Sequence, residues 1–418
     1  MDAHPRLPEE VTTAFASRDR SMPANDSFGV RLVFLLSTKC NLECVYCNID
    51  AGPHGFRPVL DPGIFESWLE AFASLRPSEI AIQLHGGEPL IVDPPVEVFS
   101  AIARNTLARF PSTKLTALSV QSNGIALDES RLDSLARAGL WINFSIDGPA
   151  WIHDRQRATA RGRGSYREAV QAHHRLRARG QNTGVIAVVT EPLHVIPALE
   201  FFLEDGFCDA RMNPVRPEGR GVSVREWDDE SFMRDMAVEF LGAAKLIATH
   251  NARCPDAPFY EHNLAEMMEF LIGENGAPTM FHWTFLIDDR GHLWAHPGSY
   301  GDDARHLVRS GPPTAERLRF ALGLNAGDGV LDGGGVRGLR QLRTRLFNAC
   351  ADCRTPDYCV PYYGPKKDAE KPSPVCVWRS ALMKLLDGWL RDESEMARRI
   401  TRTANPLAHD GGREFGTN

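Results

Sequence analysis

The chain has 418 residues, of which 47 are basic and 54 are acidic, so its net charge is -7 with neutral histidines. Hydrophobic residues make up 43% and charged residues 24%, a balance typical of globular proteins rather than disordered or collagen-like ones. This length predicts two or three domains. Size excludes a small disulfide-bonded scaffold, and nine cysteines cannot form an even-numbered disulfide framework.

The sequence carries no sign of a membrane or secreted protein. No stretch approaches the ~20 apolar residues that span a bilayer. The N-terminus has no basic region followed by an apolar one, as a signal peptide has. We therefore expect a cytoplasmic protein with reduced thiols and no membrane partner. The mildly acidic balance argues against nucleic-acid binding, and we interpret the arginines of residues 155–179 as a solvated helix surface.

Strand-like and helix-like segments alternate from about residue 30. Asp61 before Pro62 predicts a helix start, and Gly139 and Gly180 predict the ends of helices over 127–138 and 166–179. Repeated units of this kind imply an α/β fold, a partial (β/α)6 TIM-like barrel with its active site at the carboxyl ends of the strands. The strand candidates, short and rich in Val, Ile, Leu and Phe, are 30–37, 79–84, 115–121, 141–146, 183–190 and 207–213.

The remaining segments differ in character. Residues 222–272 follow a helical period. Two short strands at 284–288 and 292–295 flank a predicted hairpin turn at 289–291. Residues 376–400 predict a closing helix before a C-terminal tail. The first 28 residues are rich in Pro, Asp and Ser, and we expect a mobile arm there.

The most informative motif is Cys40-x3-Cys44-x2-Cys47, directly after the first strand candidate. A tight loop with this spacing directs three sulfurs toward one cubic cluster. Three protein ligands on a four-iron cluster leave one iron open, and an open metal position binds a substrate or cofactor. The alternative is a zinc site with Asp50 or His54 as the fourth ligand.

With these cysteines and the motifs that follow, residues 30–215 resemble the radical S-adenosylmethionine (SAM) superfamily. His85-Gly86-Gly87-Glu88-Pro89-Leu90 matches its GGEP motif, and Ser122-Asn123-Gly124 and Ser145-Ile146-Asp147-Gly148-Pro149 follow the third and fourth strand candidates. The resemblance implies that the GGEP edge holds the methionine amine of SAM, and that Arg157 contacts the carboxylate. The implied SAM-binding residues are Tyr46, His85, Gly86, Gly87, Glu88, Pro89, Ser122, Asn123, Ser145, Asp147 and Arg157.

The resemblance also implies the chemistry. The open iron of the [4Fe–4S] cluster would chelate SAM, and one electron would break the bond between sulfur and C5′. The resulting 5′-deoxyadenosyl radical would abstract a hydrogen atom from the substrate. In this chemistry the cofactor reacts, while the protein orients it and excludes water.

A second cysteine group, Cys350-x2-Cys353-x5-Cys359-x16-Cys376, resembles one auxiliary cluster of the SPASM domain. The full SPASM pattern has seven cysteines, and here Tyr363 occupies one partner position while His296 stands near another. We expect one retained auxiliary [4Fe–4S] cluster with an electron-relay or structural role, or else a zinc ion. Two further cysteines, Cys208 and Cys254, are interpreted as packing residues. His282, His292 and His296 are either ligands, bases or surface residues.

The resemblance divides the chain into five parts. They are a flexible arm, a radical SAM core, a helical linker, a SPASM-like domain, and a C-terminal helix with its tail, at residues 1–28, 29–220, 221–280, 281–380 and 381–418.

Two details indicate the substrate class. His85 before the GGEP motif and the segment 371–378 resemble FxsB/GrrM-type maturases, which form cyclophanes in ribosomal peptides. The hypothesis is a C–C cross-link between an aromatic ring and a side-chain β-carbon of a precursor peptide. Its partners would be that peptide, an electron donor such as flavodoxin or ferredoxin, and a separate peptide-recognition protein. No catalytic base is assigned.

Three alternatives remain open. One is a radical SAM dehydrogenase of a small molecule. Another is a sulfatase-maturase-like enzyme, although Pro297 stands after His296 where those enzymes place an acidic base. The third is a non-catalytic iron–sulfur or zinc protein.

Overall fold

The computed structural model describes residues 29–54, 58–225, 230–272, 283–294, 306–309, 313–322 and 374–401. The strands of these residues form one sheet. They are β1 (Gly29–Leu35), β2 (Glu79–His85), β3 (Lys114–Ser122), β4 (Trp141–Ser145), β5 (Gly184–Val189), β6 (Asp209–Pro214), β7 (Tyr260–Glu261), β8 (Trp283–Ile287), β9 (Leu293–Trp294) and β10 (His306–Val308).

The α-helices are α2 (Pro62–Ala73), α3 (Val96–Leu107), α4 (Glu129–Arg137), α5 (Ala150–Gln156), α6 (Tyr166–Ala178), α7 (Val195–Glu204), α8 (Glu230–Arg253), α9 (His262–Ile272), α10 (Ala315–Leu322), α12 (Pro374–Asp392) and α13 (Ser394–Arg398). Three short 3-10 helices follow strand ends: η1 (Pro89–Ile91), η2 (Pro192–His194) and η3 (Gly219–Ser223).

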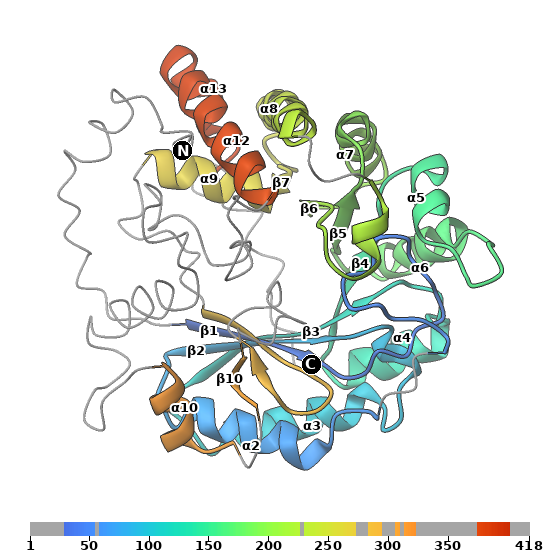
Figure 1. The fold of residues 1–418 in the computed structure, drawn as a ribbon, viewed down its shortest axis with the longest axis vertical. Coiled ribbons are helices and arrows are strands. Elements are labelled where there is room, and N and C mark those ends of the chain that lie inside the picture. Colours follow the sequence, from blue (N-terminus) through green and yellow to red (C-terminus); the bar gives the residue numbers. More distant parts are fainter. Residues whose placement is uncertain are drawn as a thin grey trace, which may run out of the picture.

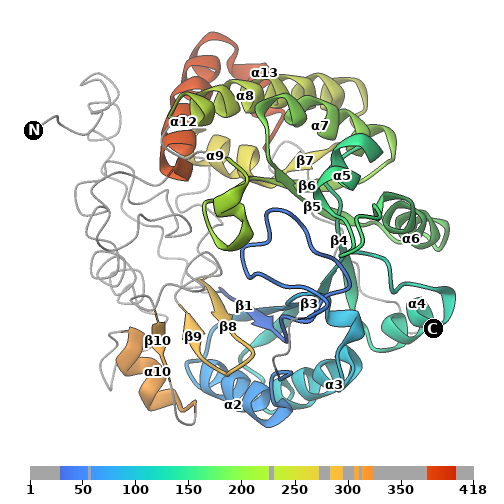
Figure 2. The same cartoon turned by 45° about the vertical axis from the view of Figure 1, so that its right-hand side comes forward.

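The strand order is β10-β9-β8-β1-β2-β3-β4-β5-β6-β7. Neighbours from β1 to β7 are parallel, and β8 joins β1 in parallel, while β9 and β10 are antiparallel. Figure 1 shows helices along the outer side of the curved sheet, and Figure 2 shows the strands in an arc around a central segment, drawn in blue, that follows β1. This arrangement confirms the partial barrel.

The six strands expected from the sequence are confirmed to within two residues at each end. The hairpin predicted around residues 289–291 is also confirmed, as β8 and β9. The helices α3, α5, α7 and α10 were not predicted, nor was the strand β10. The sheet also extends beyond six strands, by β7 at one end and by β8, β9 and β10 at the other. The hairpin therefore continues the sheet of the barrel rather than standing apart from it. The helical prediction for residues 222–272 holds for α8 and α9, whereas β7 at 260–261 interrupts it because the chain there pairs with β6.

The local signals act as expected at the helix ends. The Asp61 carboxylate accepts hydrogen bonds from the backbone nitrogens of Gly63 at 2.8 Å and Ile64 at 3.0 Å, so it caps α2. Gly139 and Gly180 follow α4 and α6 with φ values of +64° and +74°. These left-handed conformations end both helices at little cost only because the residues are glycines.

The core lies between the sheet and its outer helices. Strands β2, β4, β5 and β6 alternate buried and half-buried residues, because successive side chains point to opposite faces. On the buried side, Phe34 of β1 packs against Phe65 of α2 with ring centroids 4.3 Å apart, and Phe65 meets Phe99 of α3 at 5.2 Å. This packing fixes the carboxyl end of β1, from which the cysteine loop begins.

The closing helix predicted over 376–400 is confirmed as α12 and α13. Trp378 of α12 is fully buried and meets Phe240 of α8 edge-on, with centroids 5.0 Å apart. Asn251 of α8 donates to the Arg399 carbonyl at 2.9 Å. The last described residues of the chain thus pack against α8, the long helix that follows β6.

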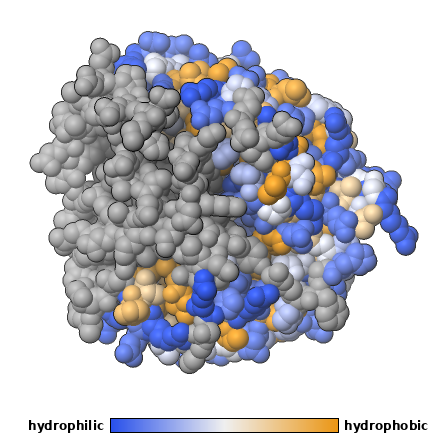
Figure 3. Space-filling view, viewed as in Figure 1, coloured by the Kyte–Doolittle hydropathy of each residue, from blue (hydrophilic) through white to orange (hydrophobic). Residues whose placement is uncertain are grey.

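The outer surface is mixed. Figure 3 shows hydrophilic side chains with scattered hydrophobic ones on the described part of one face. None of the helices in the described ranges is long and hydrophobic enough to cross a membrane. The predicted mobile arm, the tail after residue 401, and the histidines His282 and His296 lie outside the described residues.

A buried histidine joins α6 to the next strand. His173 is fully buried and its ring stacks on Phe207 with centroids 3.8 Å apart. Its Nδ1 lies 2.6 Å from the Thr183 hydroxyl, and its Nε2 lies 3.3 Å from the Asp205 carbonyl. Burial lowers the pKa of His173 to about 4, so it is neutral at neutral pH.

We predict that Trp378→Ala lowers the free energy of unfolding by roughly 3–5 kcal/mol, because it leaves a large cavity between α8 and α12. Urea unfolding followed by circular dichroism measures this. The matched control is Trp151→Ala, since Trp151 is 48% exposed, and its effect is expected to stay below about 1 kcal/mol. Equal losses from both variants would contradict the packing of α12.

We predict that His173 makes the protein less stable on acidification. Its pKa is about 4 in the fold against 6.5 when unfolded, so the unfolded chain binds the proton first and stability falls as the pH drops from 6.5 to 4. The share of this residue is up to roughly 3 kcal/mol. In His173→Phe the slope of stability against pH should decrease in that window by about one proton. An unchanged slope would show that His173 is not the responsible group.

Candidate active site

The three cysteines of the first motif lie on one loop between β1 and α2. The loop leaves the sheet at Thr38 and returns at Gly52, where the Gly52 nitrogen donates to the Thr38 carbonyl at 3.2 Å and the Cys40 nitrogen donates to the Gly52 carbonyl at 3.1 Å. Cys40 is buried, and Cys44 and Cys47 are half-buried. We call residues 38–52 the cluster loop.

The cysteine sulfurs receive N–H donors from the loop itself. The Leu42 nitrogen donates to the Cys40 sulfur at 3.4 Å, and the Ala51 nitrogen donates to the Cys47 sulfur at 3.3 Å. The Asn123 amide, just after β3, reaches the Cys40 sulfur at 3.9 Å. Hydrogen bonds to sulfur are a means by which proteins adjust iron–sulfur clusters, so this environment suits cluster thiolates.

Burial raises the pKa of the Cys40 thiol to about 12 and that of Cys44 to about 11, and the neighbouring thiols act in the same direction. Two thiolates here would repel each other in a poorly solvated place unless a cationic group lay between them. Metal binding replaces such protons. Buried, neighbouring thiols of this kind therefore suit the binding of a metal cluster.

The zinc alternative fits less well. Among the described residues, no three His, Cys, Asp or Glu side chains converge as ligands of one metal ion would. Asp50, one candidate fourth ligand, is paired with Arg220 at 2.7 Å. Sulfurs that bind separate irons of a cluster stand farther apart than ligands of one ion, so the loop suits a cluster better than zinc.

The two glycines of the GGEP motif press against the cluster loop. A Cβ on Gly86 would lie 2.5 Å from the Ser37 carbonyl oxygen, and one on Gly87 would lie 2.2 Å from that of Lys39. The Gly87 nitrogen donates to Ser37 and the Glu88 nitrogen to Lys39, at 2.8 and 2.9 Å. The absence of a side chain at both positions is what permits this close approach of chain to chain.

Glu88 ties β2 to β3. Its carboxylate accepts from the Ser122 hydroxyl at 3.0 Å, from the Asn123 nitrogen at 2.8 Å, and from the Leu90 nitrogen at 3.1 Å. Burial raises the pKa of Glu88 to about 7, while these donors act against that rise. Both carboxylate oxygens are engaged within the chain. Glu88 thereby fixes Asn123, whose amide donates to Asn41 of the cluster loop at 2.7 Å.

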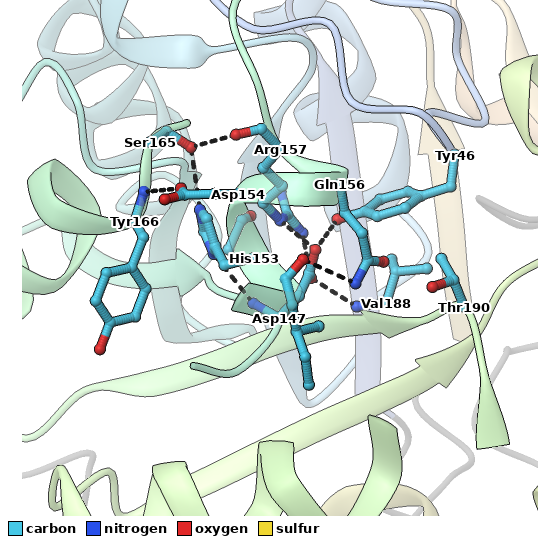
Figure 4. Close-up of polar contacts among 12 residues, drawn as sticks. Tyr46, Asp147, His153, Asp154, Gln156, Arg157, Ser165, Tyr166, Val188 and Thr190 are labelled. Atoms are coloured by element: carbon cyan, nitrogen blue, oxygen red, sulfur yellow. Dashed lines mark hydrogen bonds and ion pairs between the residues drawn. The ribbon is translucent and has the colours of Figure 1, made fainter. Parts of the chain in front are cut away.

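Asp147, after β4, is the centre of a buried polar network (Figure 4). The Tyr46 hydroxyl donates to Asp147 Oδ2 at 2.5 Å, and Arg157 donates through Nε at 2.9 Å and Nη2 at 3.1 Å. The Val188 nitrogen of β5 donates to Asp147 Oδ1 at 2.9 Å. One carboxylate therefore joins the cluster loop, the end of α5 and β5.

The charges of this network are strongly perturbed. Burial alone would lower the pKa of Arg157. The negative charge of Asp147 opposes this, and with the other neighbouring groups it raises the pKa above its usual value. Burial raises the pKa of Tyr46 well above its usual range. Both residues thus keep their protons. His153 stands behind Asp147, with Nδ1 accepting from the Asp147 nitrogen at 3.3 Å and Nε2 lying 3.0 Å from the Ser165 hydroxyl.

His85 ends β2 as a neutral donor. The Gly86 nitrogen donates to His85 Nδ1 at 2.7 Å, so the proton of the neutral ring lies on Nε2. Burial lowers the pKa of His85 to about 4, and the nearby Arg157 has the same effect. At neutral pH this residue offers a hydrogen-bond donor rather than a charge.

The structure brings the predicted residues of the first site together at the carboxyl ends of β1 to β4. Two contacts at this site were not predicted from the sequence: Gln121 donates to Ser145 at 2.8 Å, and Arg220 donates to the Cys44 carbonyl of the cluster loop at 2.8 Å. The residues brought together are Cys40, Cys44, Tyr46, Cys47, His85, Gly86, Gly87, Glu88, Pro89, Ser122, Asn123, Ser145, Asp147 and Arg157.

The second cysteine group is described only in part. Cys376 lies on α12 and is half-buried, whereas Cys350, Cys353 and Cys359 lie outside the described residues. The auxiliary site remains a prediction. His292, a candidate ligand, lies 3.3 Å from the Asp288 carboxylate in the β8–β9 turn. Cys208 contacts the Thr183 carbonyl at 3.4 Å, whereas Cys254 is exposed.

Comparison with known proteins agrees with this geometry. The family model of the radical SAM superfamily matches residues 34–197. An uncharacterised protein of Synechocystis is 27% identical over 223 residues, covering 48% of this chain and 54% of that protein. A cysteine-type anaerobic sulfatase-maturating enzyme of Clostridium perfringens is 25% identical over 182 residues, covering 41% of this chain and 47% of the enzyme. The chain thus spans about half the length of these two relatives.

Solved structures share the fold over more of the chain. The structure described as native anSMEcpe with bound AdoMet has a TM-score of 0.65 at 16% identity, and the match covers 89% of this chain and 100% of that one. Streptococcus suis SuiB bound to S-adenosylmethionine has a TM-score of 0.54 at 14% identity, covering 80% and 72%.

Residues 34–197 are therefore a radical SAM domain. Within this domain, Cys40, Cys44 and Cys47 of the cluster loop are placed to fit a [4Fe–4S] cluster.

Proposed function

We propose that this radical SAM enzyme modifies a ribosomally made precursor peptide by a C–C cyclophane cross-link between an aromatic ring and a side-chain β-carbon. The observation that carries the enzyme class is the cluster loop, three cysteines held by the residues after β2 and β3 inside the matched domain. Support for a peptide comes from relatives named as sulfatase-maturating enzymes and from similar folds bound to peptides, anSMEcpe with Cp18Cys and SuiB with its precursor SuiA.

In this proposal the chain's residues hold and orient the cofactors. Cys40, Cys44 and Cys47 would bind three irons of the cluster and leave the fourth open to SAM. When bound, these cofactors supply an electron and a 5′-deoxyadenosyl radical that removes a hydrogen atom from the substrate. Arg157 uses Nε and Nη2 on Asp147, which leaves Nη1 for the SAM carboxylate.

The cross-link fixes the balance of the reaction. Joining a β-carbon to an aromatic carbon removes two hydrogens, one as an atom from the β-carbon and one as a proton from the ring, with one electron left over. Cys350, Cys353, Cys359 and Cys376 are proposed to hold an auxiliary [4Fe–4S] cluster that would accept this electron. A zinc ion bound by these cysteines would have no redox chemistry and would leave the electron to an external acceptor, an iron–sulfur or flavin protein. The initial electron would come from a flavodoxin or ferredoxin.

Two observations favour other products. The sulfatase-maturating relatives and the anSMEcpe fold favour a maturase that oxidises one side chain in place of joining two. The GTP 3',8-cyclase 2 of Mycobacterium tuberculosis is 33% identical over 143 residues, 30% of this chain, which favours a small-molecule substrate. The product of the reaction separates these candidates.

We predict that Cys44→Ser abolishes reductive cleavage of SAM, because the cluster loses one of its three protein ligands. The purified protein is reconstituted anaerobically with iron and sulfide, and 5′-deoxyadenosine is measured after addition of SAM and dithionite. The matched control is Cys254→Ser, since Cys254 is exposed and lies far from the cluster loop in sequence. Wild-type amounts of 5′-deoxyadenosine from Cys44→Ser would refute the assignment.

We predict that the reconstituted enzyme removes two hydrogens from a short aromatic-rich peptide encoded beside its gene. Mass spectrometry should show this loss, and tandem spectra should show no backbone fragments between the joined residues. Exchange of a cysteine sulfur for a carbonyl oxygen would instead identify a sulfatase-maturase-type reaction. An unmodified peptide, with 5′-deoxyadenosine still formed, would contradict the peptide proposal.

A further inference from the structure

A short segment after β6 lies against the cluster loop, more than 160 residues away in sequence. Figure 2 shows this 3-10 helix, η3, in yellow-green beside the blue loop that follows β1. The Arg220 nitrogen donates to the Cys47 carbonyl at 3.0 Å. Gly219 has φ +52°, and a Cβ there would lie 2.4 Å from the Cys47 oxygen. Only glycine permits this approach.

The Arg220 side chain then spans the loop. Its Nε donates to the Cys44 carbonyl at 2.8 Å and its Nη2 to the Ala51 carbonyl at 2.7 Å. Its Nη1 donates to the Asp50 carboxylate at 2.7 Å. A guanidinium directs donors in one rigid plane, which lets it connect three separate points of a loop.

We propose that Arg220 is a positioning residue for the cluster, which holds the second half of the cluster loop in its ligating shape and sets a permanent positive charge beside the cluster. This inference rests on the proposed cluster chemistry. It concerns a residue outside the matched domain at 34–197.

The two halves of the loop are held differently. The first half, around Cys40, is held by the backbone of Gly87 and Glu88 and by the Asn123 amide. In the second half, Cys44 and Cys47 are the ligands, and Arg220 binds the carbonyls of both. The loop contains no helix or strand, and its own turns supply only the Cys47 nitrogen to the Cys44 carbonyl at 3.2 Å and the Asp50 nitrogen to the Cys47 carbonyl at 3.3 Å. Val45 and Tyr46 tie this half to Gln156 and Asp147, and Arg220 adds the shorter bonds to the two cysteine carbonyls.

Asp50 shows that this half of the loop is under constraint. It has φ +53°, a left-handed conformation that non-glycine residues rarely adopt, although Asp tolerates it better than most. Its carboxylate and the next carbonyl, Ala51, are both bound by Arg220. The guanidinium therefore holds the turn at the point where the chain reverses toward the sheet.

The charge of Arg220 reaches the ligands. The Arg220 Nε lies 2.8 Å from the Cys44 carbonyl and the Arg220 backbone nitrogen 3.0 Å from the Cys47 carbonyl, so the guanidinium stands beside two of the three cluster cysteines. The Asp50 side chain is 73% exposed, so solvent screens its charge more than that of Arg220, which is 28% exposed. Because a nearby cation favours the more negative, reduced form of a cluster, Arg220 should raise its reduction potential.

The test compares Arg220→Gln, which removes the charge, with Arg220→Lys, which keeps it. Asp50→Asn removes only the ion pair, and Arg161→Gln is the matched control, since Arg161 is exposed on the turn between α5 and α6. Two quantities are measured: amide hydrogen exchange of residues 44–51 in the cluster-free chain, and the reduction potential of the reconstituted cluster by a titration followed by electron paramagnetic resonance.

We expect exchange in residues 44–51 to become roughly tenfold to a hundredfold faster in Arg220→Gln, because hydrogen bonds from a charged donor are lost. The potential should become more negative in Arg220→Gln and stay near the wild-type value in Arg220→Lys. Chelators should also remove iron faster from Arg220→Gln. Exchange in strands β1 to β3 reports in the same experiment that each variant is folded.

Several results would overturn the inference. Exchange in Arg220→Gln equal to that in Arg161→Gln would refute the holding role, and equal potentials in the Gln and Lys variants would refute the role of the charge. If Asp50→Asn reproduced every effect, Arg220 would act only as a surface ion pair. A wild-type chain that takes up no cluster would refute the proposed function instead, while the exchange measurement would still decide whether Arg220 holds the loop.

Discussion

The structure depends on one constraint: a loop without helix or strand must present three sulfurs in a buried place. Its peptide groups cannot be satisfied by regular secondary structure, and leaving them unpaired in a dry site is costly. The surrounding strand ends supply the partners. The backbone after β2 binds Ser37 and Lys39, the end of α5 binds Glu43 and Val45 through the carbonyls of residues 156 and 158, and η3 binds Cys47. The elements around the barrel therefore supply the hydrogen-bond donors and acceptors that the backbone of this loop needs.

The buried charges follow from the same constraint. Asp147 and Arg157 lie where solvent is excluded. A single unpaired charge in such a place would be strongly destabilising. Each is stabilised by the other, and Tyr46 and the Val188 nitrogen complete the coordination of the carboxylate. Because Tyr46 is a neighbour of Cys47 in sequence, the network also fixes the cluster loop from a second side. The motif residues thus form one connected structure rather than a set of separate ligand contacts.

Much of this arrangement could be predicted from the sequence. The features that could not be predicted are contacts between residues far apart in the chain. The short hydrophobic runs predicted β1 to β6, and Asp61, Gly139 and Gly180 predicted helix ends, because these signals are local. The pairing of β8 with β1 was not predicted, since it joins residues about 250 positions apart. Arg220 was missed for the same reason: nothing near it in sequence shows that its guanidinium reaches Cys44.

The motif residues make most of their polar contacts within the chain, which limits the groups that they can offer to a substrate. Both oxygens of Glu88 accept hydrogen bonds within the chain, and the Asp147 carboxylate accepts four, from Tyr46, Arg157 and Val188. The two glycines of the motif lie directly against the cluster loop. These residues therefore define the place of the chemistry but offer few groups to a substrate. The half-buried positions on the inner face of the strands, Gln83 of β2, Asn143 of β4 and Asn213 of β6, alternate with the core residues and point away from the outer helices. We expect these polar inner-face positions, which the motif does not specify, to be the ones available for contact with a substrate.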